Sequence, residues 1–145
     1  MVLATGATVP LTFKWYIITR INSTTQVTVR MGFSALGLSG NPPTDGIYFE
    51  NITAGALVNW DCITRAASAE TNTDTGSVMD TSFHTFLIEG NGTNVLFYID
   101  GVLKCTQATN LPTAALVPFF SIIATEAVAK NMDLDAFIGW LRVVR

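Results

Sequence analysis

Hydrophobic residues alternate with other residues along most of this chain, and this period of two constrains the fold more than any other feature. In Phe13–Ile21, one face carries Phe13, Trp15, Ile17 and Ile21, and the other carries Lys14, Tyr16, Ile18 and Arg20. The segment Gln26–Phe33 repeats the pattern, with Thr28 and Arg30 facing outward and Val27, Val29, Met31 and Phe33 facing inward. Successive side chains of a strand point to opposite faces. We therefore expect two strands, each with one solvated face, joined by the polar turn Asn22–Thr25.

Further segments of strand length follow, rich in β-branched and aromatic residues and bounded by turn residues. They are Ile47–Asn51, Ala56–Ala66, Phe83–Gly90, Leu116–Ala124 and Asp133–Val144. The Gly, Pro, Asn and Asp content of Leu38–Gly46 predicts a loop. Thr125–Met132 tolerates two turns of helix and is equally compatible with a loop. Short strands without βαβ alternation predict an all-β fold, an antiparallel β-sandwich of the jelly-roll type. We expect one domain over residues 1–145, with residues 1–10 as an N-terminal arm.

The segment Asn94–Thr106, "NVLFYIDGVLKCT", carries the strongest turn signal of the chain. Asp100-Gly101 between two β-rich runs predicts a two-residue hairpin joining Val95–Ile99 to Val102–Thr106. The first strand is apolar on both faces, because Val95, Phe97 and Ile99 alternate with Leu96 and Tyr98. We expect the core to cover one face, and the opposing sheet, a loop or a neighbouring chain to cover the other.

The composition excludes several partners and suggests another. Charged residues make up only 13% of the 145 residues and apolar residues 49%, with a mean hydropathy of +0.40. This predicts that some apolar surface is buried against other chains, as in a homo-oligomer. A net charge of −3 with eight scattered Lys and Arg residues predicts no nucleic-acid partner. No apolar run approaches the ~18 residues of a membrane span, and no pattern calls for a cofactor.

The two cysteines, Cys62 and Cys105, are too few for a disulfide framework and lack the spacing of metal ligands. We expect two buried free thiols, with a single disulfide bond as the alternative.

Several segments resemble concanavalin A-like lectin/glucanase jelly-roll domains of the kind found in tailed-phage virion proteins. The resemblance covers about Leu11 to Arg145 and rests on Thr44–Glu50, the surroundings of Trp60, Thr71–Gly76, Gly92–Thr113 and Met132–Arg142. It implies a non-enzymatic virion structural protein of a bacteriophage, such as a capsid decoration protein or a head- or tail-fibre module. Such a protein is made in the host cytoplasm and binds other virion proteins and copies of itself. The alternative is a lectin-like, carbohydrate-binding module for host or environmental glycans.

The enzymatic members of this superfamily use two or three carboxylates on one strand, one as acid and one as nucleophile. No such array occurs here. Asp133 and Asp135 come nearest, and we interpret them as the polar start of the last strand. We therefore expect no enzymatic activity, no catalytic residue and no metal site. A third reading, a hydrolase or lyase fragment, requires a carboxylate pair that the sequence does not display.

Three residues are candidates for ligand binding: Trp60, Arg65 and His84. Trp60 could stack on a sugar ring, but it alternates with Val58 and Cys62 as a core residue does. His84 is the single histidine, and no Ser or Cys can be placed beside it from the sequence, so it is expected to be solvated or to anchor a turn. Asp100 and Gly101 are expected to be structural turn residues.

Overall fold

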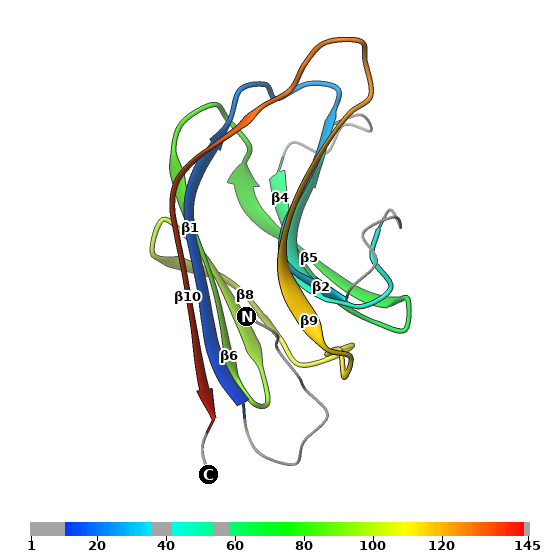
Figure 1. Ribbon diagram of the computed structural model, residues 1–145, viewed down its shortest axis with the longest axis vertical. Helices are drawn as coiled ribbons and strands as arrows, with labels where there is room; N and C mark the ends of the chain where they lie inside the picture. The colour runs from blue at the N-terminus through cyan, green and yellow to red at the C-terminus, as the bar shows by residue number, and fades with distance from the viewer. Residues whose placement is uncertain (1–10, 36–41, 54–58, 144–145) are drawn as a thin grey trace.

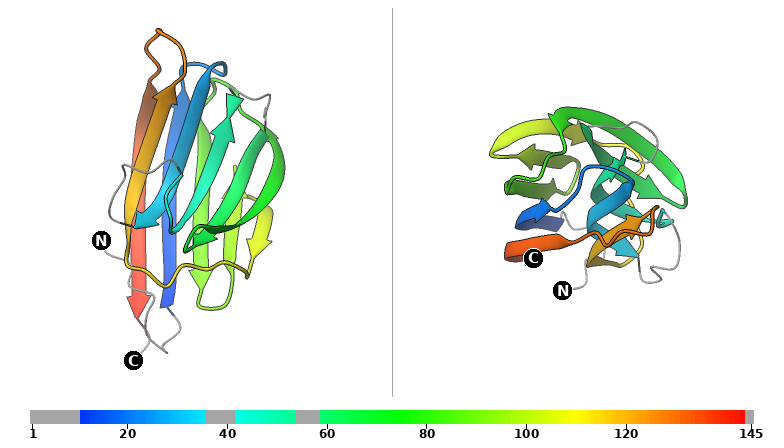
Figure 2. Two further views of the ribbon diagram at one scale, coloured as in Figure 1. Left: turned by 90° about the vertical axis from the view of Figure 1, so that its right-hand side faces the viewer. Right: turned by 90° about the horizontal axis from the view of Figure 1, so that it is seen from above.

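The computed structural model describes residues 11–35, 42–53 and 59–143, which form two five-stranded sheets packed face to face (Figure 1, Figure 2). Sheet A has the order β5-β4-β3-β2-β9, and sheet B has the order β10-β1-β6-β7-β8. The strands of sheet A are β2 (Val27–Ala35), β3 (Gly46–Ile52), β4 (Asn59–Ala66), β5 (Ala69–Val78) and β9 (Leu116–Ala124). Those of sheet B are β1 (Leu11–Ile21), β6 (His84–Asn91), β7 (Val95–Ile99), β8 (Val102–Gln107) and β10 (Met132–Val143).

All neighbouring strands pair antiparallel, so the predicted all-β antiparallel sandwich is confirmed. The described residues contain no helix that is long and apolar enough to cross a membrane. The predicted N-terminal arm, residues 1–10, lies outside the described residues.

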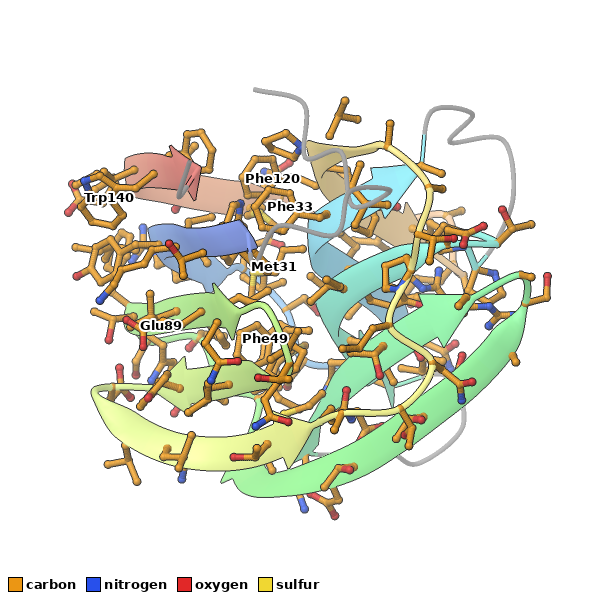
Figure 3. The ribbon with its side chains drawn as sticks, turned by 90° about the horizontal axis from the view of Figure 1, so that it is seen from below. Met31, Phe33, Phe49, Glu89, Phe120 and Trp140 are labelled. Atoms are coloured by element: carbon orange, nitrogen blue, oxygen red, sulfur yellow. A yellow bond between two sulfur atoms is a disulfide. The ribbon has the colours of Figure 1, made fainter. Side chains whose placement is uncertain are left out.

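The core lies between the sheets and follows the alternation in the sequence. The inward residues of β1 and β2 predicted above are all buried. Figure 3 shows Met31, Phe33 and Phe49 in the space between the sheets, where Phe49 packs edge-on against Phe86 and Phe97. A buried side chain of this size contributes about 1.5–3 kcal/mol to folding.

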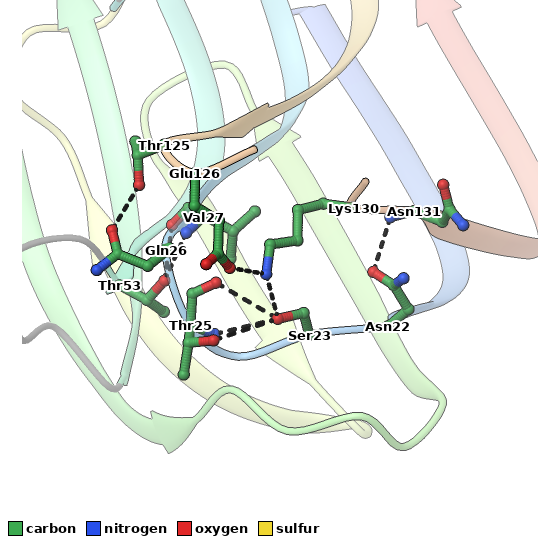
Figure 4. Close-up of polar contacts among 10 residues, drawn as sticks. All are labelled: Asn22, Ser23, Thr25, Gln26, Val27, Thr53, Thr125, Glu126, Lys130 and Asn131. Atoms are coloured by element: carbon green, nitrogen blue, oxygen red, sulfur yellow. Dashed lines mark hydrogen bonds and ion pairs between the residues drawn. The ribbon is translucent and has the colours of Figure 1, made fainter. Parts of the chain in front are cut away.

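The connection from β1 to β2 crosses from sheet B to sheet A, and the connection from β9 to β10 crosses back beside it (Figure 4). Lys130 Nζ donates to Ser23 Oγ at 2.8 Å, and the Asn131 backbone N–H donates to Asn22 Oδ1 at 2.7 Å. Thr125 Oγ1 also donates to Gln26 Oε1 at 2.8 Å. The segment 125–131 that holds these contacts is a loop, the second of the two alternatives for Thr125–Met132.

The predicted hairpin is present, with β7 and β8 joined by Asp100 and Gly101. Both residues have positive φ, 51° and 75°, as a type I′ turn requires. Val95, Phe97 and Ile99 are buried in the core, whereas Leu96 and Tyr98 are half-buried on the outer face of sheet B.

The expectation of free thiols is wrong, because Cys62 and Cys105 form a disulfide bond. Cys62 lies on β4 of sheet A and Cys105 on β8 of sheet B, so the bond joins the two layers. The alternation alone placed both side chains inside the sandwich, and only the packing of the sheets brings them together.

Two further expectations differ from the structure. No strand is predicted between Ala66 and Phe83, but β5 occupies Ala69–Val78. Its residues are polar and mostly exposed because β5 is an edge strand. The outer face of β2 is also not solvated: Thr28 and Arg30 are only 7% and 5% exposed.

Candidate functional site

Four charged residues form one row across the outer face of sheet A, which we term the charged row: Arg30, Glu50, Asp61 and Asp74. Arg30 lies opposite Glu50 on the neighbouring strand, Glu50 opposite Asp61, and Asp61 opposite Asp74. Residues directly opposite each other in an antiparallel pair have Cβ atoms about 4.5–5.5 Å apart. The register of β2, β3, β4 and β5 therefore brings three carboxylates side by side.

The first three residues of the charged row are buried, although they lie outside the core between the sheets. Arg30 forms an ion pair with Glu50 through Nε and Oε2. Burial raises the pKa of Glu50, and the neighbouring Arg30 guanidinium opposes this effect without cancelling it. A carboxyl group with a raised pKa holds its proton more readily than one in water.

Asp61 and Asp74 are neighbours in opposite environments. Asp61 is only 4% exposed, and burial raises its pKa, although Asn72 Nδ2 donates to Asp61 Oδ2 at 3.4 Å. Asp74 is exposed and accepts hydrogen bonds from the Gly76 backbone N–H at 2.6 Å and from Asn59 Nδ2 at 3.0 Å. These bonds lower the pKa of Asp74. The pair thus combines a carboxyl group that loses its proton less readily than in water with one that loses it more readily, and an acid and a base divide their roles in this way.

Tyr48 lies beside the charged row, two residues before Glu50 on β3. Its side chain is fully buried and packs edge-on against Phe119 at 5.6 Å between ring centroids. The Tyr48 ring lies over Gly46, where an added Cβ would come within 2.9 Å of it. The Tyr48 hydroxyl has no hydrogen-bond partner. Burial, with the nearby Glu50 and Glu70 carboxylates, raises its pKa, so the phenol keeps its proton.

Of the three candidate ligand residues, only Arg65 lies on this face. Arg65 Nη1 forms an ion pair with Glu70 Oε2 at 2.6 Å, and its Nε is buried without a partner. Trp60 is 3% exposed and packs on Phe86 in the core at 4.9 Å between ring centroids. His84 contacts Asp100 at 2.6 Å through Nδ1 and Asp80 at 3.1 Å through Nε2.

Trp60 and His84 are brought together, away from Arg65. They line a cavity of about 300 Å³ near the β7–β8 hairpin, with Ser77, Val78, Asp80, Ile99 and Asp100. His84 holds the turn residue Asp100 there, and Asp100 Oδ1 also accepts from the Thr85 backbone N–H at 2.8 Å.

Asp133 and Asp135, the carboxylates singled out from the sequence, lie on β10 in sheet B. Asp133 pairs with Arg20 at 2.7 Å. A register shift near Thr19 leaves Asp135 without an opposite residue on β1. Among the described residues, no group of three or more His, Cys, Asp or Glu side chains is placed to hold a metal ion.

The sequence did not reveal the charged row because its members come from four strands. Glu50 and Asp61 are the single acidic residues of β3 and β4, and Asp74 shares β5 with Glu70 alone, whereas the array expected of an enzyme was two or three carboxylates on one strand. The sequence signal for the charged row is an acidic residue at an outward position of each of three successive strands. This signal cannot be used unless β5 is identified as a strand.

No protein-family model matches the chain, and no curated protein matches it significantly. Solved structures do match. A glycosyl hydrolase family protein from Mycobacterium fortuitum has a TM-score of 0.68 at 12% identity, over 97% of this chain and 65% of that one. A β-1,3-glucanase from Mycobacterium marinum has a TM-score of 0.67 at 13% identity, over 97% and 65%. An alginate lyase in complex with dimannuronate has a TM-score of 0.65 at 9% identity, over 99% and 68%. This chain spans about two thirds of the length of each of these three proteins.

These neighbours contradict the expectation that the protein is not an enzyme, because glycoside hydrolases and alginate lyases adopt its fold. That expectation rested on the lack of a carboxylate pair on one strand, whereas the register of sheet A sets carboxylates side by side on neighbouring strands. At identities of 9–14% the likeness establishes the architecture. The chain folds as a concanavalin A-like jelly roll of the kind seen in β-glucanases and polysaccharide lyases.

Proposed function

We propose that the protein is a carbohydrate-active domain that binds a saccharide chain on the outer face of sheet A and cleaves it with carboxylates of the charged row. The observation that carries this proposal is the direct pairing of Asp61 with Asp74, whose pKa values are shifted in opposite directions. The fold shared with glucanases and alginate lyases supports a carbohydrate as the substrate class.

In this proposal Asp61 is the general acid that protonates the glycosidic oxygen, because its pKa is raised and it therefore holds its proton to higher pH than Asp74 does. Asp74 is ionised and reaches solvent, which suits a nucleophile or a base. Retaining glycosidases hold their two carboxyl groups about 5–5.5 Å apart, and inverting ones about 6.5–9.5 Å apart. Directly opposed residues on neighbouring strands have Cβ atoms about 4.5–5.5 Å apart, which favours the shorter carboxyl spacing. We therefore expect retention of the anomeric configuration.

Arg30 and Glu50 have a positioning role next to this pair. Their buried ion pair lies on the side of Asp61 away from Asp74. Glu50 lies directly opposite Asp61, and the carboxylates of Asp74 and Glu70 add to burial in raising the pKa of Asp61. Like charges close to a carboxyl group disfavour its ionisation.

The test is turnover of a panel of β-1,3-glucan, mixed-linkage β-glucan and alginate by the wild type and by variants. We expect Asp61→Asn and Asp74→Asn each to lower kcat/KM by about 10²–10⁴-fold, the usual contribution of a positioned acid or base. Asp133→Asn is the matched control, because this exposed carboxylate lies on the other sheet and should leave kcat/KM unchanged. NMR of the first product gives its anomeric configuration.

Absence of turnover on every substrate, or equal turnover by Asp61→Asn and the wild type, would overturn the catalytic role. Thermal melting of each variant separates loss of activity from loss of folding. Saccharide binding without turnover would leave the carbohydrate-binding alternative, in which the same polar face recognises glycans.

Alginate is on the panel because one specific feature favours elimination as a second candidate reaction. The Tyr48 hydroxyl is protonated and has no hydrogen-bond partner, and because the side chain is fully buried, its use as a proton donor requires saccharide binding to uncover it. Formation of an unsaturated, ultraviolet-absorbing product from alginate, lost in Tyr48→Phe and kept in Asp74→Asn, would assign a lyase instead of a hydrolase.

A further inference from the structure

A second row of functional side chains crosses the opposite side of the molecule, on the outer face of sheet B. Trp140 lies opposite Lys14, Lys14 opposite Glu89, and Glu89 opposite Leu96 on successive strands. Trp140 is half exposed, although it is the largest side chain of β10. Figure 3 shows Trp140 and Glu89 on the same outer side of sheet B.

These side chains line a groove of about 810 Å³, which we term the Trp140 groove. Its lining also includes Thr12, Phe13, Gly90 and Asn91. This volume lies within the range of about 300–1,000 Å³ that is usual for small-molecule sites. The charged row and the Trp140 groove lie on the outer faces of different sheets, so the groove is a separate site.

The rim and floor of the groove are fixed by local contacts. Asn91 Oδ1 accepts hydrogen bonds from the backbone N–H groups of Thr93 and Asn94 at 3.1 and 2.8 Å, which holds the side chain in place. Phe13 packs against Gly90 so closely that an added Cβ would lie 2.0 Å from the ring. Any larger residue at position 90 would displace the Phe13 ring, which lies in the core beneath the groove.

The polar groups of the groove are paired but keep capacity for a ligand. Lys14 Nζ forms an ion pair with Glu89 Oε1, and the two side chains are 56% and 23% exposed. An ammonium group has three donors and a carboxylate about four acceptor sites, so one ion pair leaves several of each unused. Hydrogen bonds from these charged groups to hydroxyls are stronger than those between neutral groups.

The exposed indole of Trp140 lies beside the Lys14–Glu89 ion pair and the amide of Asn91. This combination fits one chemical class of ligand in particular. A sugar ring has an apolar face of C–H groups and an edge of hydroxyls, so it matches an aromatic face flanked by polar groups. Lys14 and Glu89 together carry no net charge and the chain has a net charge of −3, which favours a neutral sugar over a uronate. A purely apolar protein partner would leave the ion pair desolvated, at a cost.

We propose that the Trp140 groove is a second saccharide-binding site, specific for neutral glycans, which holds a polysaccharide chain on sheet B. Trp140 stacks on the sugar ring, and Lys14, Glu89 and Asn91 bind its hydroxyls. The site acts independently of the charged row.

The experiment measures the retardation of the full chain in native gels containing soluble β-1,3-glucan, with alginate gels for comparison. Four proteins are compared: the wild type, Trp140→Ala, the double variant Asp61→Asn/Asp74→Asn, and the triple variant. We expect Trp140→Ala to weaken glucan binding about tenfold or more in both backgrounds. Phe83→Ala is the matched control, because Phe83 is an equally exposed aromatic residue outside the groove.

Glu89→Gln and Lys14→Met test the polar contacts, and each should weaken binding while the melting temperature stays near that of the wild type. Equal retardation of the wild type and Trp140→Ala, or binding of alginate in preference to glucan, would overturn the proposal. Light scattering tests whether a second copy of the chain occupies the groove instead of a glycan. If Trp140→Ala dissociates an oligomer and leaves glucan binding unchanged, the groove is a contact between chains. The double variant Asp61→Asn/Asp74→Asn shows separately whether the charged row contributes to glucan binding.

Discussion

At the scale of single residues, the position most sensitive to pH is His84, the only histidine of the chain. Both ring nitrogens contact carboxylates, of Asp100 and Asp80. Burial lowers the pKa of His84, but the hydrogen bonds to Asp100 and Asp80 outweigh it and raise the pKa above its ordinary value. The same contacts help to lower the pKa values of Asp100 and Asp80.

This cluster predicts a pH window of stability. Because the folded pKa of His84 is raised, its contribution is complete below the unfolded value of about 6.5 and is lost as pH rises through the folded pKa. The two aspartates have lowered pKa values, so their contribution is present above about pH 4 and is lost as pH falls through the folded values. Urea unfolding should give a higher free energy of unfolding at pH 5.5 than at pH 8.5. His84→Gln should reduce this difference, and an unchanged pH dependence in that variant would refute the role of His84.

At the scale of elements, the β7–β8 hairpin depends on the backbone at Gly101. Its φ is +75°, and a Cβ added there would have nothing within 4 Å, so the cost of a side chain is backbone strain alone. We expect Gly101→Val to lower the free energy of unfolding by about 1–3 kcal/mol. Gly101→Asn should cost less, since Asn tolerates positive φ. Denaturant unfolding of both variants checks this, and equal stability of Gly101→Val and the wild type would show that the turn does not require positive φ.

Elements with a strong apolar alternation, such as β1 and β2, could be predicted from the sequence nearly to their ends. The hairpin could be predicted too, because Asp-Gly is a local signal. β5 could not, because an exposed edge strand need not carry apolar residues. The charged row and the disulfide depend on register and on the packing of two sheets, which join residues far apart in the chain. Arg30 on β2 shows the same limit: its outward position was predicted, and its burial was not.

At the scale of the whole molecule, the two sides of the sandwich are held together differently. Beside β4 and β8, the layers are joined by the Cys62–Cys105 disulfide and by Gln107, whose Nε2 donates to the Cys62 carbonyl at 2.8 Å. Beside β9 and β10, Phe120 packs on Phe137 at 5.7 Å between ring centroids, and both rings are partly exposed. Binding to other virion proteins or to copies of the same chain stays a prediction from the sequence, and this side is where we expect such contacts.

The covalent link predicts how the sandwich responds to reduction. The bond closes a loop with a sequence separation of 43 residues, for which the chain-entropy model gives about 4 kcal/mol of stabilisation. For a domain of this size such a loss lowers the melting temperature by roughly 10 °C. We expect that drop on addition of dithiothreitol and in the double variant Cys62→Ala/Cys105→Ala. The double variant should then be insensitive to dithiothreitol, which serves as the control. If reduction leaves the wild-type melting temperature unchanged, the packing of β4 against β8, with Gln107 between them, holds the two sheets together without the bond.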